Sequence, residues 1–319
     1  MRFFTSKPKT FIDSARGDAQ AAELRKAAAA GQWQAVEAAL EATTDKSRRE
    51  FLVDTLGLET TNLGWVDAWL QARPDRQSAH LVWGACAVQY AWSIRSGREP
   101  QHVSSEQFRG FHDWLLQAQE RLQQAAAMDP EDSAPYVPLQ WAAVGLGVPL
   151  EDATARWEAI SRLNPATELG AHAYTTFAGP RWNGTPELMW TFVRGLLEHE
   201  REGSPRWTLV PTAHFERWVA DRMSKNAPIH ASRYFQQPDV QRDIEDAYAR
   251  YLGSPSRAPS PLEGQHREYF ACAYYLMGKR EELRRQLEQV GPGIQVIPWG
   301  FLGSPRVAYQ SAREAAGLR

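Results

Sequence analysis

Cysteine is nearly absent from this chain of 319 residues: the two that occur, Cys86 and Cys272, lie in apolar patterns beside alanines. Two separated thiols of this kind are typical of small buried side chains in a reducing compartment. Long apolar runs are also missing, since Gln89 and Ser93 interrupt the longest one, and a membrane helix needs about 20 apolar residues. Charged residues, not an apolar run, follow the first segment of the chain, which disfavours a secretory signal. We therefore expect a soluble, cytoplasmic protein.

An excess of charge of either sign is lacking as well. The chain has 36 Lys and Arg residues against 38 Asp and Glu residues, and no run of five like charges occurs. Nucleic acids and anionic membranes are bound through concentrated basic surfaces. This composition therefore disfavours nucleic acid and membrane as main partners.

Sequence motifs of catalysis are absent too. The chain has no glycine-rich phosphate loop, nucleophile elbow, Cys-x-x-Cys pair or His-Glu-x-x-His helix. The adjacent pair His199-Glu200 is a poor metal site, because neighbouring side chains on a helix diverge by about 100°. We expect neither a metal nor a cofactor. The eight histidines stand singly at positions His80, His102, His112, His172, His199, His214, His230 and His266.

What the chain does have is a repeated helical stripe. Ala118, Ala153 and Met189 stand 35 and 36 residues apart, and apolar or small residues follow each of them four and seven positions on. A period near 35 with a helical stripe inside it is typical of stacked helix pairs. The followers are Leu122 and Ala125, Trp157 and Ile160, and Val193 and Leu196.

Helix start and stop signals divide the rest of the chain. Ser104 with Gln107 forms a capping-box pattern, and Thr185 before Pro186 predicts another helix start. Glycines at positions 31, 147 and 278 separate the helices of predicted hairpins. Seven prolines between 205 and 261 predict short, irregular helices there.

Together these signals predict an all-α fold, an irregular α-solenoid forming a single elongated domain over 1–319. Its clearest repeat units lie within 104–201, followed by an irregular helical region over 203–262. A C-terminal hairpin over 263–290 precedes an extended tail over 291–319. The strand-like stretch 294–302 is expected to fold back over the array, and limited proteolysis that released it without loss of stability would contradict this.

Several segments of the chain resemble the tetratricopeptide repeat (TPR). Asp129-Pro130 and Asn164-Pro165 match the polar residue and proline that end a unit of that family, and about half of the chain is covered. The resemblance implies helical hairpins stacked into a solenoid with a concave binding face. The residues that match the paired aromatics, turn glycine and second-helix stripe are Tyr274, Tyr275, Met277, Gly278, Leu283, Leu287 and Val290, and Gly31, Trp33, Val36 and Leu40 repeat the second half.

A narrower resemblance concerns the turn before Met189. The segment 180–186, with proline, arginine and tryptophan before a helix start, is similar to a turn in a group of bacterial repeat proteins that have no assigned activity. This resemblance supports the fold and the bacterial origin, and implies no chemistry.

The resemblance also implies which residues face a ligand. Trp182 is unusual among the 13 tryptophans because it falls at a turn beside Arg181, and Arg-Trp pairs are good recognition elements. If the units dock as in the family, Tyr174, Arg181 and Trp182 line the concave face. The last hairpin then presents Gln265, Glu268 and Tyr275 on its corresponding face. We predict a non-enzymatic scaffold or adaptor that binds a protein or peptide partner.

Two alternatives remain open. One is an enzyme or small-molecule-binding protein with a pocket in the irregular region 170–230, where polar side chains from distant segments could converge. The other is a structural oligomerisation module, which would show a large apolar surface patch. The residues considered for the first alternative are His172, Tyr174, Arg181, Glu187, His199 and His214.

Overall fold

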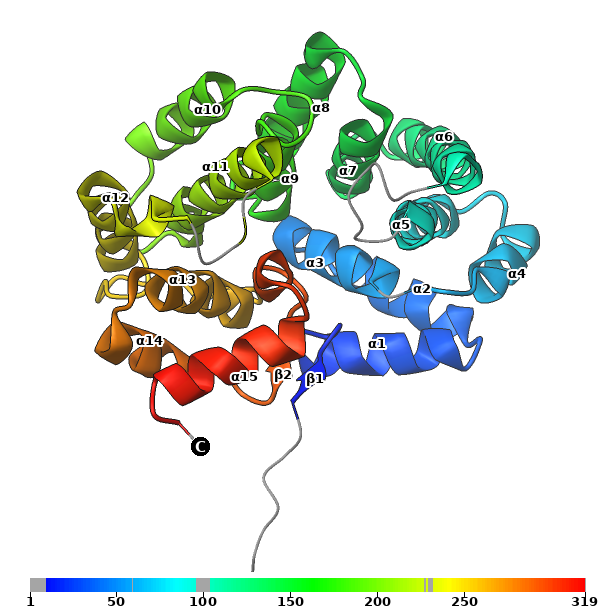
Figure 1. The fold of residues 1–319 in the computed structure, drawn as a ribbon. Coiled ribbons are helices and arrows are strands. Elements are labelled where there is room, and N and C mark those ends of the chain that lie inside the picture. Colours follow the sequence, from blue (N-terminus) through cyan, green and yellow to red (C-terminus); the bar gives the residue numbers. More distant parts are fainter. Residues whose placement is uncertain (1–9, 59, 96–103, 227, 229–231, 319) are drawn as a thin grey trace, which may run out of the picture. The chain divides into compact units, whose positions relative to one another are not determined.

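The computed structural model describes residues 10–58, 60–95, 104–226, 228 and 232–318. These residues form fifteen α-helices, and their strands are two elements of two residues each, which confirms the all-α class (Figure 1). The contacts divide the chain into two compact units. Unit 1 combines the described residues of Met1–Gly17 and Val193–Arg319, and unit 2 is Asp18–Phe192.

Unit 2 begins with five helices that alternate with short connections. Gly31 has a positive φ of 71° between the first two, and it ends the first helix as the sequence predicts. The helices are α1 (Ala19–Ala29), α2 (Trp33–Glu41), α3 (Lys46–Gly57), α4 (Gly64–Ala72) and α5 (Gln77–Arg95).

The second half of unit 2 holds the predicted repeat units. The capping box of Ser104 and Gln107 is present, and the hydroxyl of Thr185 accepts a hydrogen bond from the Leu188 amide at 3.1 Å. The helices are α6 (Ser105–Met128), α7 (Tyr136–Leu146), α8 (Leu150–Leu163), α9 (Leu169–Phe177) and α10 (Pro186–Glu198), the last of which continues into unit 1.

The helical stripes of these units are buried. Helix α5 packs on α6 and α7, and α7 packs in turn on α8 and α9. Ala118 and Ala153 are fully buried, as is Met189. Trp157 is only half-buried, and Leu197 is more buried than the predicted Leu196. The sequence therefore places the buried face of α6 correctly, and that of α8 at Ala153 and Ile160 but not at Trp157. It misses the buried face of α10 by one residue at its C-terminal end.

Unit 1 contains the remaining helices. Helix α11 packs on α12 and α13, and α13 packs on α14. Gly278 ends α13 with a φ of 76°, as expected for a left-handed C-cap. The elements are η2 (Pro205–Thr208), α11 (Leu209–Lys225), η4 (Tyr234–Gln236), α12 (Pro238–Arg250), α13 (Glu263–Met277), α14 (Arg280–Leu287), η5 (Trp299–Leu302) and α15 (Pro305–Ala315).

The tail after residue 290 differs from the prediction. Strand β2 (Gly293–Ile294) is extended as expected, but it pairs in parallel with β1 (Phe11–Ile12) near the other end of the chain. The rest is not an extended tail, because η5 and α15 follow. Helix α15 starts at Pro305 after Ser304 and buries Ala308, Tyr309 and Ala312. Proline at the first helical position and this apolar spacing are the signals that the prediction missed.

Candidate functional site

A buried carboxylate joins α3 to two connections between helices of unit 2. Glu50 in α3 is 2% exposed and accepts hydrogen bonds from the Ser133 hydroxyl at 2.6 Å and the Thr167 hydroxyl at 2.7 Å. It also accepts one from the Asn164 amide at 2.9 Å. Burial raises the pKa of Glu50, and the three donors oppose that shift in pKa. Ser133 and Asn164 lie in the connections that follow α6 and α8, so this one side chain fixes both.

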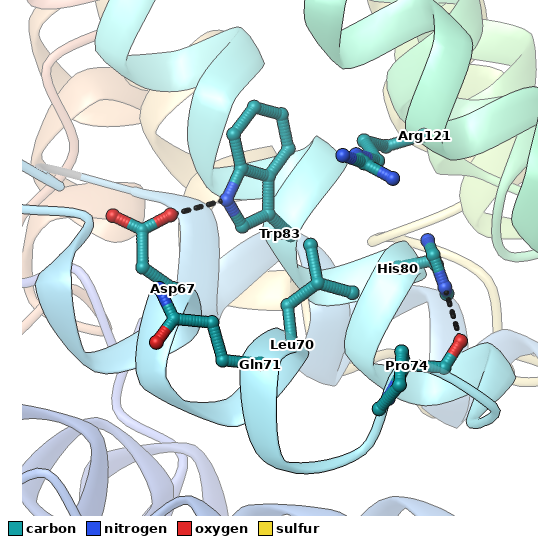
Figure 2. A pocket seen from close by; sticks show the side chains of 7 residues that line it. All are labelled: Asp67, Leu70, Gln71, Pro74, His80, Trp83 and Arg121. Carbon is teal, nitrogen blue, oxygen red and sulfur yellow. Dashed lines mark hydrogen bonds between the residues drawn. The ribbon is translucent and has the colours of Figure 1, made fainter.

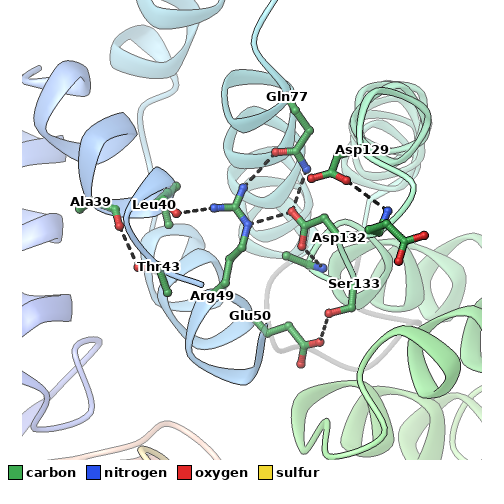
Figure 3. A network of polar contacts seen from close by, with 11 residues as sticks. Ala39, Leu40, Thr43, Arg49, Glu50, Gln77, Asp129, Asp132 and Ser133 are labelled. Atoms are coloured by element: carbon green, nitrogen blue, oxygen red, sulfur yellow. Dashed lines mark hydrogen bonds and ion pairs between the residues drawn. The ribbon is translucent and has the colours of Figure 1, made fainter. Parts of the chain in front are cut away.

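Arg49 extends the polar network on the same helix (Figure 3). Its guanidinium donates to Asp132 at 2.8 Å, to the Leu40 carbonyl at 2.6 Å and to Gln77 at 3.0 Å. Gln77 also donates to Asp132 at 2.9 Å, which closes a ring of hydrogen bonds. An open cavity of about 710 Å³ is lined by Arg49 and Asp132 and by charged side chains that include Arg76. Because the charges of Arg49 and Asp132 are already paired, we interpret this network as structural.

Trp182 lies in a cluster of aromatic and cationic side chains of unit 2. The guanidinium carbons of Arg95 and Arg181 lie 5.2 and 5.1 Å from the centre of its ring. The ring of Trp92, one turn before Arg95 in α5, meets Trp182 edge-on at 5.2 Å between centroids. Trp92 also packs edge-on against Phe111 of α6 at 4.9 Å. The last turn of α5, the first half of α6 and the connection from α9 to α10 therefore meet at this cluster.

The positive charges of this cluster lie close together. Burial lowers the pKa of Arg95, and the neighbouring charge of Arg181 lowers it further. Within the described part of the chain, Arg95 forms no ion pair and no hydrogen bond through its side chain. A half-buried cation that lacks an acidic neighbour is destabilised, and a bound anion would relieve this cost.

The turn that carries Trp182 depends on a glycine. A Cβ atom at Gly184 would lie 2.0 Å from the carbonyl oxygen of Ala178, which is a backbone atom that cannot rotate away. The neighbouring Asn183 amide holds the turn by donating to the Val144 carbonyl in α7 at 3.0 Å. This close approach of the backbone fixes the position of Trp182.

We expect the Gly184→Ala variant to unfold with a free energy about 2 to 3 kcal/mol lower, because the added methyl group forces the turn apart. Urea denaturation followed by circular dichroism measures this. Gly195→Ala is the matched control, since a Cβ there meets no atom within 4 Å and alanine favours the helix. Equal stability of the two variants would show that the turn yields without cost.

Tyr174 is not exposed on a binding surface. Its side chain is 5% exposed, shares a hydrogen bond of 2.8 Å with Thr154, and packs edge-on against Phe192 at 4.6 Å. This placement corrects the expectation that Tyr174 faces a ligand. The physical reason is that α9 is buried over nearly all of its length, so its aromatic side chains fill the space between helices.

The predicted residues of the last hairpin belong to unit 1, and the Trp182 cluster belongs to unit 2. Glu268 is 1% exposed and accepts hydrogen bonds from the backbone amide of Gln295 at 3.0 Å and from the Trp299 indole at 2.7 Å. Burial raises the pKa of Glu268 well above its ordinary value. Glu268 therefore holds the segment around β2 instead of facing a ligand, which corrects the prediction. Gln265 and Tyr275 are half-buried on the same helix, and their role in binding stays a prediction.

The residues of the enzyme alternative are spread over both units. His214 in α11 is 4% exposed, and its Nδ1 lies 2.8 Å from the Tyr234 hydroxyl. Its Nε2 lies 3.6 Å from a carboxylate oxygen of Asp243, and the neighbouring imidazole of His214 lowers the pKa of Asp243. Burial raises the pKa of Tyr234, which opposes its use as a base. His172, Glu187 and His199 lie outside this group, and a pocket in 170–230 stays a prediction.

The part of the chain that the structure describes holds neither a metal-ligand cluster nor a membrane-spanning helix. In that part, no three His, Cys, Asp or Glu side chains are grouped as metal ligands. None of the helices there is both long enough and apolar enough to cross a bilayer. Cys86 and Cys272 are buried free thiols, as the sequence predicts.

Comparisons with known proteins give one partial similarity. No protein-family model matches the chain. No solved structure matches it. A stretch of 120 residues, 37% of the chain, is 33% identical to the probable inorganic carbon transporter subunit DabA of Jannaschia sp. (strain CCS1). The chain covers 14% of the length of that protein, so the similarity does not establish a family.

The sequence indicates Arg181 and Trp182 as recognition residues, but it does not indicate Trp92 and Arg95, which contact Trp182 in the fold. The spacing of three residues between these two, at the end of a predicted helix, is the signal that could have indicated a shared face. Nothing in the sequence places the end of α5 beside the turn that precedes α10, because the two segments are about 85 residues apart along the chain.

Proposed function

We propose that the chain is a non-enzymatic binding module, an irregular α-solenoid of TPR-like hairpins, which recognises an acidic segment of a partner protein at the Trp182 cluster. The observation that carries the proposal is that the guanidinium groups of Arg95 and Arg181 both lie over the Trp182 ring, 5.2 and 5.1 Å from its centre. Carboxylates bind guanidinium groups through charge-assisted hydrogen bonds, and the ring offers an apolar surface beside them.

The charge of the cluster supports an acidic partner. Arg95 brings positive charge to a half-buried position, and no carboxylate of the described chain pairs with it. A glutamate or aspartate of a partner would supply the missing negative charge and would lose little hydration at a half-buried site.

The surface beside the cluster supports an apolar contact as well. Phe108 in α6 is 41% exposed and packs against Phe111 at 6.3 Å between ring centroids, and Phe111 contacts Trp92. Exposed aromatic residues and arginines are both enriched in protein interfaces. A segment that combines acidic and apolar residues would therefore fit this surface better than a purely acidic one.

The experiment uses the full chain and a fluorescein-labelled peptide, Gly-Glu-Asp-Phe-Glu-Asp-Gly, in a fluorescence anisotropy titration. We expect binding that weakens with salt, a loss of affinity of about tenfold in Arg95→Gln and a larger loss in Trp182→Ala. Arg162→Gln is the matched control, because Arg162 is an exposed arginine of α8 in the same unit. Circular dichroism checks that each variant is folded.

Two outcomes would refute the proposal. One is equal affinity for the acidic peptide and for a peptide in which lysine replaces its glutamates and aspartates. The other is equal affinity of the Arg95→Gln and Arg162→Gln variants for the acidic peptide. Either result would show that Arg95 and Arg181 do not select the ligand.

The proposal also places the protein in the cytoplasm, which the buried, unpaired thiols of Cys86 and Cys272 support. The partial similarity to DabA concerns a transporter subunit. It adds no site residue to the Trp182 cluster, so the proposal rests on the geometry of that cluster.

A further inference from the structure

A second cavity of unit 2 lies between α4, α5 and α6, away from the residues of the Trp182 cluster. Its volume is about 370 Å³, which falls within the range of small-molecule pockets, about 300 to 1,000 Å³. Figure 2 shows the residues that line it, which come from one face of α4, from the connection to α5, from α5 itself and from α6. They are Asp67, Leu70, Gln71, Pro74, His80, Trp83 and Arg121.

His80 brings an unused hydrogen-bond acceptor to this cavity. The side chain is 2% exposed, and its Nε2 lies 2.9 Å from the carbonyl oxygen of Pro74. A carbonyl oxygen only accepts, so Nε2 carries the hydrogen, and in the neutral ring Nδ1 is an acceptor. Nδ1 is buried and has no hydrogen-bond partner among the residues that the structure describes, and Figure 2 shows it turned toward Arg121. A buried polar atom without a partner costs free energy that a ligand donor would recover.

Two opposite charges stand at the rim of the cavity. The guanidinium of Arg121 lies over the Trp83 ring, 5.9 Å from its centroid, and forms no ion pair within the described part of the chain. The carboxylate of Asp67 accepts a hydrogen bond from the Trp83 indole at 2.7 Å and keeps further acceptor capacity. Trp83 itself is 7% exposed and forms an apolar wall between these charges.

We infer that this cavity binds a small amino acid as a zwitterion. Arg121 pairs with the carboxylate of the ligand, because a guanidinium has donors only and matches a carboxylate in shape. The ammonium group of the ligand has donors only, and it meets two acceptors, His80 Nδ1 and the Asp67 carboxylate. Leu70 and Trp83 contact the side chain of the ligand.

Each part of the ligand is required by this arrangement. A ligand that has a carboxylate but no amino group leaves His80 Nδ1 without a hydrogen-bond donor. A ligand that has an amino group but no carboxylate adds a second positive charge near Arg121. Acetate and ethylammonium are therefore expected to bind far more weakly than an amino acid that carries both groups. This inference does not depend on the proposed peptide-binding function, since none of the residues involved belongs to the Trp182 cluster.

The test is isothermal titration of the full chain with each of the twenty common L-amino acids, and with acetate and ethylammonium as single-charge probes. We expect at least one small amino acid to bind, and Arg121→Gln to weaken its binding about tenfold or more through loss of a charge-assisted pair. Arg162→Gln and Trp182→Ala are expected to leave this affinity unchanged. The Trp182→Ala result separates this inference from the proposed function.

A second readout reports on His80 without changing it. In long-range ¹H–¹⁵N spectra of histidine-labelled protein, bound ligand is expected to shift the Nδ1 resonance of His80, because that nitrogen gains a hydrogen bond. Three results would overturn the inference: no amino acid binds, acetate binds as tightly as the amino acids, or the Arg121→Gln and Arg162→Gln variants bind alike. In the first case the cavity holds water only.

Discussion

The Glu50→Ala variant is expected to unfold with a free energy about 3 to 4 kcal/mol lower than that of the unchanged protein. Glu50 accepts three hydrogen bonds in a site that is 2% exposed, and alanine leaves all three donors without this acceptor. A buried donor that loses its partner costs about 1 to 3 kcal/mol. Urea denaturation, with helix content as the signal, measures the change.

The loss is also expected to spread beyond α3. The donors on Ser133, Asn164 and Thr167 belong to the connections that follow α6 and α8, and Lys46 of α3 donates to the Leu163 carbonyl at 2.9 Å. Amide hydrogen exchange should therefore accelerate in both connections together. Exchange that accelerated in α3 alone would show that the connections hold their own geometry.

Glu50→Gln is the conservative control and separates charge from shape. The folded state raises the pKa of Glu50 above its ordinary value of 4.5, so the carboxyl group binds its proton more tightly when the protein is folded. This contribution to stability is full below pH 4.5 and is lost as the pH rises through the folded pKa. Glutamine does not titrate and can still accept and donate, so the decline with pH should be shallower in Glu50→Gln. An unchanged decline would mean that Glu50 does not titrate within this range.

The Trp299→Ala variant is expected to lower the free energy of unfolding of unit 1 by about 4 kcal/mol, which is the second large effect. Trp299 is fully buried, packs edge-on against Tyr309 at 5.3 Å, and donates its indole hydrogen to Glu268 at 2.7 Å. Alanine creates a cavity and removes one of the donors that stabilise the buried carboxylate. Limited proteolysis measures the effect as faster cleavage between β2 and α15.

Two substitutions control this result. Trp299→Phe keeps most of the ring but removes the donor, so we expect about half of the loss. Val307→Ala lies in the same segment at a side chain that is 65% exposed, and is expected to change stability by about 0.5 kcal/mol or less. Cleavage that was equally fast in Trp299→Ala and Val307→Ala would show that the tail is not anchored through Trp299.

Much of the helical framework could be predicted from local signals. The break at Gly31, the capping box at Ser104 and the start at Thr185 depend on side chains within a few residues of the helix ends, so the sequence reveals them. The spacing between the buried alanines at positions 118 and 153 can also be read directly from the sequence. The arrangement of these hairpins as a solenoid stays a prediction.

The contacts that the sequence could not predict join distant segments. Glu50 looks like an ordinary charged residue of an amphipathic helix, and only the fold brings three donors from beyond residue 130 around it. The prediction that Tyr174 and Glu268 face a ligand is wrong for the same reason. The sequence of a helix does not reveal which other segment of the chain covers its aromatic and acidic side chains. His80 likewise gives no sign in the sequence of its unpartnered nitrogen.

The parallel pairing of Phe11 with Gly293 and of Ile12 with Ile294 has a consequence for synthesis on the ribosome. Unit 2 is continuous in sequence and is complete before unit 1, which is complete only when its two distant pieces meet. Strand β1 has no partner until residues 293 and 294 are translated, and domains generally fold as units during synthesis. A nascent chain halted before residue 290 would therefore carry a folded insert within an unfinished host domain.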